Sequence, residues 1–110
     1  MATPLYSHLF YSAAGLTAGV WHVGTVPGGF VWVLRDFDAY ANTDALERVD
    51  VLLRGAEDQG IFYASWGASD QFSKQWQGRQ VIPPGYPVSL HVGGNSRVDV
   101  ALSGYVLAIP

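Results

Sequence analysis

The sequence predicts an all-β protein, a single antiparallel β-sandwich of the jelly-roll kind with about eight strands. Two observations support this prediction. Apolar and polar residues alternate with a period of two in several segments, and short apolar runs recur at spacings of roughly 8 to 12 residues with turn residues between them. A third observation is negative, because no segment alternates strand and helix patterns as a parallel βαβ fold requires.

The strands follow from their apolar runs. Residues 48–54 and 97–103 alternate most clearly, placing Val49, Val51 and Leu53 on one face in the first and repeating that pattern in the second. Residues 30–34 form a continuous apolar run that continues toward Tyr40, typical of a central strand buried on both faces near its start, with Trp32 in the core. The remaining predicted strands are 5–12, 19–26, 60–66, 72–77 continuing to 82, 86–92, and 104–109 as a continuation of the last strand.

Turn residues separate these runs. Segments 26–29, 83–86 and 93–96 combine proline, which fixes φ, with glycine or asparagine, which accept positive φ. Only residues 42–53 could contain a helical turn, since Thr43 or Asp44 can cap it and Glu47 follows. We expect a loop there with at most one turn.

Composition limits the class of protein. The 110 residues suffice for one domain over 1–110, and 49% hydrophobic content suffices for its core. The absence of cysteine excludes a disulfide scaffold and a thiolate nucleophile. With a net charge of −3 and no basic cluster, we expect neither nucleic acid nor an anionic membrane as a partner.

Charge is distributed unevenly along the chain. Residues 1–34 contain no Asp, Glu, Lys or Arg, whereas ten of the fifteen charged residues lie between Arg35 and Asp58. Glycine and proline interrupt the uncharged third, which argues against a membrane span, and no basic region marks a secretory signal. We expect another subunit to cover an uncharged surface, with residues 1–12 as a docking segment; the alternative is an uncharged polar surface on a monomer. The candidate interface residues are Leu5, Tyr6, Leu9, Phe10 and Tyr11.

Catalytic and metal-binding patterns are weak. His8, His22 and His91 lack the short spacing that lets two imidazoles share a metal. Asp36 and Asp38 lie on one face of a strand, where they could hold a cation or, as we favour, be solvated or paired with arginines. No nucleophile elbow or phosphate-binding loop is present. We expect no enzymatic activity and no cofactor or metal.

Four tryptophans and six tyrosines are many for this length. Most are expected in the core or at an interface, where such residues are favoured. The alternative is that some rings form a stacking platform for sugars, with Trp66 and Trp76 as the candidate ligand-facing aromatics. The chain would then be a carbohydrate-binding module that contacts host cell-surface glycans.

Three segments carry a resemblance to a known family. Residues 25–38 (TVPGGFVWVLRDFD), 78–87 (GRQVIPPGYP) and 98–107 (VDVALSGYVL) resemble the small β-sandwich virion proteins of tailed bacteriophages, especially those of actinobacteria, of the minor tail or capsid decoration type. With the opening around Tyr6 to Tyr11, the resemblance covers most of the chain. These motifs describe a fold, and they transfer no catalytic residue.

The resemblance implies a structural protein of the virion, assembled in the host bacterial cytoplasm. It implies a homo-oligomer, with a trimer favoured, and other virion proteins such as the major capsid or tail proteins as partners. Symmetric assembly would cover the uncharged surface and hide exposed strand edges. The resemblance does not distinguish tail from capsid.

Overall fold

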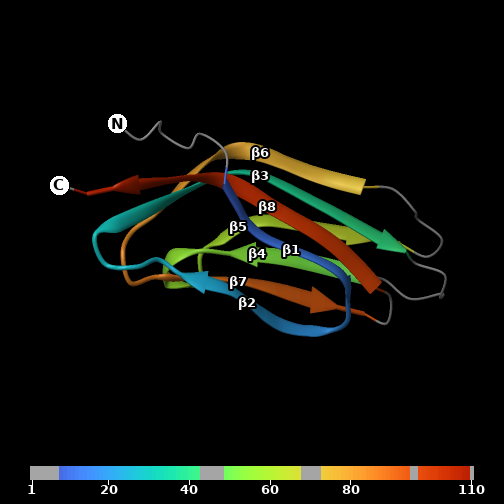
Figure 1. Cartoon of the computed structure of the whole chain (residues 1–110). Helices are drawn as coiled ribbons and strands as arrows, with labels where there is room; N and C mark the ends of the chain where they lie inside the picture. The colour runs from blue at the N-terminus through green and yellow to red at the C-terminus, as the bar shows by residue number, and fades with distance from the viewer. Residues whose placement is uncertain (1–7, 43–48, 68–72, 95–96, 110) are drawn as a thin grey trace.

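A computed structural model describes residues 8–42, 49–67, 73–94 and 97–109, and these residues form two packed layers of strands (Figure 1). The described part of the chain contains no α-helix and one 3-10 turn, η1 (Ala56–Asp58). The strands are β1 (His8–Leu16), β2 (Gly19–Thr25), β3 (Phe30–Asn42), β4 (Val49–Arg54), β5 (Gly60–Trp66), β6 (Ser73–Ile82), β7 (Pro87–Gly93) and β8 (Arg97–Ala108).

The strands form two antiparallel sheets of four. Sheet A has the order β1-β8-β3-β6, and sheet B has the order β2-β7-β4-β5. The first strand therefore pairs with the last, the second with the seventh, the third with the sixth and the fourth with the fifth. A long hairpin rolled up in this way is a jelly roll. The predicted all-β class, eight-strand count and jelly-roll sandwich are confirmed.

The core lies between the sheets and follows the alternation read from the sequence. Val49, Val51 and Leu53 of β4 are all fully buried. In β8 of sheet A, Val98, Val100 and Leu102 are buried in the same way and belong to the same core cluster. The largest buried side chains are Trp66 and Phe37, and the Phe37 ring meets the Phe62 ring edge-on at 5.5 Å. A period of two with one face inward is therefore the rule in both sheets.

Strand β3 lies between β8 and β6, as expected for the central apolar run. The neighbouring residues Val33 and Leu34 are both buried, so β3 is covered on both faces at this point, whereas Phe30 at the start of the strand is 40% exposed, contrary to the prediction. The prediction for Trp32 was too strong, because this side chain is half-buried and packs against the edge of the core. A β-bulge between Leu34 and Asp36 shifts the register of β3 against both neighbours.

Two predicted turns lie side by side at one end of the sandwich. Gly29 and Gly85 both have φ of 85°, a conformation that glycine adopts without strain. The Val26 amide donates to the Tyr86 carbonyl at 3.0 Å, and the Gly85 amide donates to the Val26 carbonyl at 2.8 Å. These hydrogen bonds join the β2–β3 and β6–β7 connections into one unit.

Local sequence signals misplaced one strand end and missed one short turn. Strand β1 extends to Leu16, beyond the predicted end at Ser12, because pairing with β8 holds small residues that favour no strand by themselves. The short turn η1, which was not predicted, follows β4, and Glu57 there has φ of 56°. The expected loop at residues 43–48 lies outside the described residues, as does the 95–96 part of the third predicted turn.

Candidate functional site

The outer surface of sheet A carries a group of apolar side chains near the paired turns. Trp32 reaches toward Gly24 of sheet B, and Leu34 belongs to the core, so strand alternation places Val31 and Val33 on the outer side. Val33 is only 2% exposed, yet it does not belong to the core cluster between the sheets. Val33 is therefore buried on the outer side of sheet A and not between the sheets.

Strand register identifies the neighbours of Val33. Val33 pairs with Val81 of β6 on one side and with Tyr105 of β8 on the other, and Val31 pairs with Leu107. Leu9 of β1 pairs with Ser103, two residues before Tyr105 on the same side of β8. We call this group the apolar face; it consists of Leu9, Val31, Val33, Val81, Tyr105 and Leu107.

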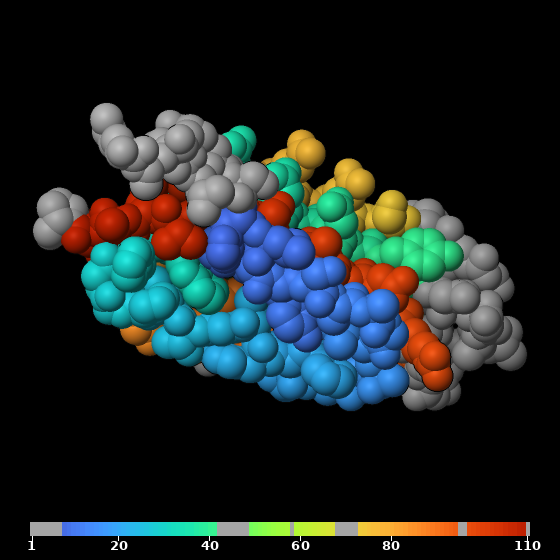
Figure 2. Space-filling model, in the orientation of Figure 1, coloured from blue at the N-terminus to red at the C-terminus, as the bar shows by residue number. Residues whose placement is uncertain are grey.

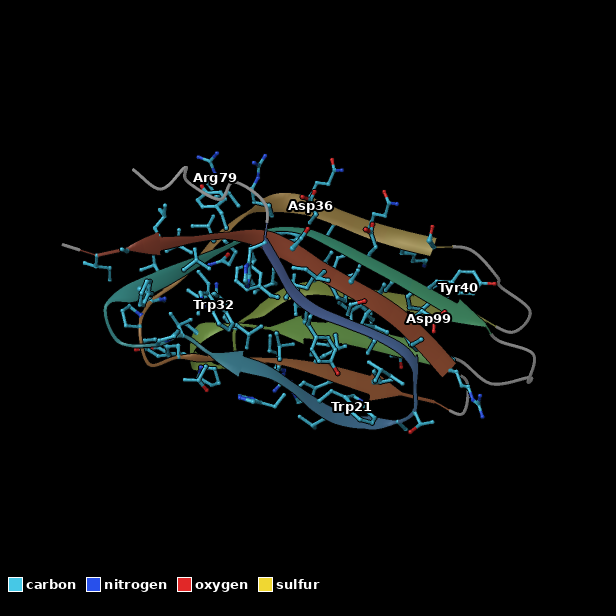
Figure 3. The ribbon with its side chains drawn as sticks, viewed as in Figure 1. Trp21, Trp32, Asp36, Tyr40, Arg79 and Asp99 are labelled. Atoms are coloured by element: carbon cyan, nitrogen blue, oxygen red, sulfur yellow. The ribbon has the colours of Figure 1, made fainter. Side chains whose placement is uncertain are left out.

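The apolar face is open to solvent in part. Leu9 is 58% exposed, and Val81 and Leu107 are each 48% exposed. Charged residues border the face, since Arg79 lies two residues from Val81, and Figure 3 shows Arg79 and Asp36 on the outer side of sheet A, away from Trp32 between the sheets. An apolar surface with a charged border is the arrangement typical of a protein–protein contact.

The five predicted interface residues fall into three groups. Leu5 and Tyr6 lie outside the described residues. Leu9 is exposed and belongs to the apolar face. Phe10 and Tyr11 are half-buried against the chain's own core, and the Phe10 ring lies 4.8 Å from the Trp32 ring. The interface assignment of these residues stays a prediction.

The prediction of Trp66 as a ligand-facing aromatic is wrong. Its side chain is 0% exposed and is the largest in the core. Strand β5 has aromatic residues on both faces, so alternation alone did not reveal which face turns inward. The fold places Ala64 and Trp66 inside and leaves Tyr63 55% exposed, with its hydroxyl donating to Asp50 Oδ1 at 3.0 Å.

The second predicted aromatic, Trp76, is half-buried. It packs partly against the core from β6, at the edge of sheet A. A Cβ added at Gly78 would lie 2.7 Å from the Trp76 ring, so this glycine leaves room for the indole. A ligand-binding role for Trp76 stays a prediction.

The histidines and aspartates that were considered as metal ligands lie on different surfaces of the molecule. His22 of β2 and His91 of β7 are neighbours on the outside of sheet B, and each Nε2 lies 3.4 Å from a hydroxyl oxygen, of Thr25 and Ser89 respectively. His8 is in sheet A. Asp36 and Asp38 face the same side of β3, as predicted, opposite Gln77 and Gln75. Across the described ranges, no three His, Asp or Glu side chains lie close enough to hold a metal ion.

Two further observations concern the described residues alone. None of their helices is long and apolar enough to cross a bilayer. Every buried polar side-chain atom among them has a hydrogen-bond partner. The second observation means that no unsatisfied donor or acceptor in the described core indicates a missing ligand.

The strand order defines the class of this protein as a jelly-roll β-sandwich with an apolar outer face on one sheet. No protein-family pattern matches the sequence, and no curated protein matches it.

Among solved structures, Eiger TNF from S. frugiperda is similar, with a TM-score of 0.47 and 11% identity over 81% of this chain; the match spans 66% of the length of that chain. The structure of the extra small virus (XSV) virus-like particle of the giant freshwater prawn Macrobrachium rosenbergii matches with a TM-score of 0.40 and 12% identity, over 96% of this chain and 82% of that chain. These remote likenesses concern overall architecture and do not indicate a function.

Proposed function

We propose that this protein is a non-enzymatic structural component of a virion, a minor tail or capsid decoration protein of a tailed bacteriophage, and that it acts through protein–protein assembly. The observation that carries the assembly role is the apolar face, with half-exposed Leu9, Val81 and Leu107. The virion setting rests on the resemblance of residues 25–38, 78–87 and 98–107 to small phage virion proteins.

A second copy of the same chain is the partner that the charges favour. Each chain has a net charge of −3, so identical copies repel one another unless they meet through uncharged surface. The apolar face contains no charged residue, and its contact between copies requires no buried ion pair. A closed homo-oligomer, with a trimer favoured, covers this face on every copy.

The test is the oligomeric state of the purified chain and of two matched variants, measured by size-exclusion chromatography with light scattering. We expect the native chain to be oligomeric. The double variant Val81→Asp/Leu107→Asp places two like charges on each apolar face and should dissociate the assembly. Val20→Asp is the control, because Val20 is 66% exposed on β2 of the other sheet. Circular dichroism confirms that both variants fold.

The virion setting has a separate test. Mass spectrometry of purified phage particles should detect the native chain at a fixed ratio to the major capsid or tail protein, and the Val81→Asp/Leu107→Asp variant should be lost from them. A chain that stays monomeric at every concentration and is absent from particles would overturn the proposal. Equal association of the native chain and the double variant would exclude the apolar face as the contact.

A further inference from the structure

A shallow hollow lies on the outer surface of sheet A, toward the opposite end of β3 from the apolar face. Its volume is about 470 Å³, and all four strands of sheet A contribute to it. Val33 and Tyr40 are seven residues apart on β3, which corresponds to about 24 Å along an extended strand. On β1, however, Leu9 of the apolar face and Ser12 of the hollow are only three residues apart, about 10 Å, so the hollow adjoins the apolar face without sharing a residue with it.

Strand register explains why the surface is depressed here. Ser12 of β1, Ala101 of β8 and Asp38 of β3 lie in one row across the sheet, and Tyr40 pairs with Asp99 in the next row. The small side chains of Ser12 and Ala101 form the floor of the hollow, and the longer side chains of Asp38, Tyr40 and Asp99 rise around it. The result is an open depression with polar side chains at its sides.

The chemical groups around this floor are an aromatic ring, two carboxylates and hydroxyls. Tyr40 is 38% exposed and presents its ring beside Asp99, as Figure 3 shows at the end of β3. The Asp99 carboxylate is held in one orientation, because its Oδ1 accepts a hydrogen bond from the Gly15 amide at 2.8 Å. Ser12 and Ser73 add hydroxyls that can donate and accept.

We propose that this hollow binds a neutral sugar residue, a function beyond the proposed assembly role. A pyranose ring has an apolar face that fits an aromatic side chain and small alanines, and its hydroxyls donate well to carboxylates. Asp38 and Asp99 are two negative charges against the single positive charge of Arg97 at the border. Anionic sugars are therefore repelled, and neutral hexoses or N-acetylhexosamines are the ligand class.

The Asp38 and Asp99 carboxylates can also attract a cation, and the test includes that outcome. The ¹⁵N-labelled chain is titrated separately with methyl glucoside, methyl galactoside, rhamnose, N-acetylglucosamine, glucuronate and arginine. We expect at least one neutral sugar to shift the amides of residues 12–14, 38–40 and 99–101, with a dissociation constant of about 1 mM. Glucuronate and arginine should leave these amides unchanged.

Two tyrosine variants form the matched pair for this test. Tyr40→Ala removes the ring beside the hollow and should weaken binding roughly tenfold, while Tyr40→Phe retains it. Tyr63→Ala is the control, because Tyr63 is 55% exposed on the other sheet. The proposal is overturned if no neutral sugar shifts these amides, if only arginine or glucuronate does, or if Tyr40→Ala binds as tightly as the native chain. Repeating the titration on the Val81→Asp/Leu107→Asp variant, which should be monomeric, distinguishes failure here from failure of the assembly proposal.

Discussion

At the scale of single residues, two glycines differ in whether the structure leaves room for a larger side chain. Gly104 of β8 is buried where β8 passes between β1 and β3. A Cβ there would collide with the Val33 carbonyl oxygen and lie 3.0 Å from the Phe10 ring. A Cβ added at Gly28, in the β2–β3 turn, would meet no heavy atom within 4 Å.

We therefore expect Gly104→Ala to destabilise the fold by about 1–3 kcal/mol, because the backbone of β3 cannot move aside without breaking its pairing. Gly28→Ala, the matched control, should change stability by less than about 0.5 kcal/mol. Urea denaturation followed by tryptophan fluorescence measures both. Equal stabilities of the two variants would show that β8 and β3 do not approach as closely as described.

The composition of β5 explains why Trp66 was wrongly predicted to face a ligand. Residues 61–66 of β5 present large apolar side chains on both faces, so period-two alternation was satisfied by either orientation. The inward position of Trp66 depends on its contact with the other sheet, which local sequence does not encode. The ring consequently contributes to stability through burial, and a sugar cannot reach it.

At the scale of elements, the position of a strand in its sheet determines how firmly its amides are held. β3 and β8 have a paired strand on each side in sheet A, as β7 and β4 have in sheet B. β1, β6, β2 and β5 each have one free edge within the described sheets. Opening a central strand breaks two ladders, whereas opening an edge strand breaks one.

Native-state hydrogen exchange should therefore be slowest at amides of β3 and β8, and faster by at least about tenfold at those of β5. NMR of the ¹⁵N-labelled chain measures both sets in one experiment. Slow exchange along the outer edge of β5 would contradict the strand order, unless the double variant that disrupts assembly also removes it. That variant is the control for edge protection by a neighbouring copy.

At the scale of the whole molecule, pairing is dominated by contacts between distant parts of the chain. The hydrogen bond from Gly15 to Asp99 joins residues 84 positions apart, and the whole β1–β8 ladder has comparable separations. In the view of Figure 2, segments from both ends of the chain lie on the same face of the molecule. In such a topology the chain must close long loops, at a cost in conformational entropy, before the contacts between distant strands can stabilise the fold.

The chain should accordingly fold slowly, in about a millisecond to seconds, as other non-local β-sandwiches do. Stopped-flow dilution from urea, detected by the fluorescence of the four tryptophans, of which Trp66 is fully buried, gives the rate. Measurement over a range of protein concentrations separates folding from assembly, since only assembly depends on concentration. Folding within microseconds would be incompatible with the paired first and last strands.

The amino-acid sequence by itself determined the strands, because alternation and turn residues are local properties. It correctly predicted about eight strands and the inward faces of β4 and β8. It also led to the proposal of an uncharged contact surface, for which only Leu9 of the five candidates is both described and exposed.

Only the tertiary structure decided which residues share a surface. The apolar face and the hollow each draw side chains from several strands that are distant in the chain, and register between those strands brings Tyr40 beside Asp99 and Val33 beside Val81. Register depends on the β3 bulge and on packing between the sheets, where a shift of one residue exchanges inside for outside. Register is therefore set by many weak contacts between strands, and no single segment of the sequence determines it.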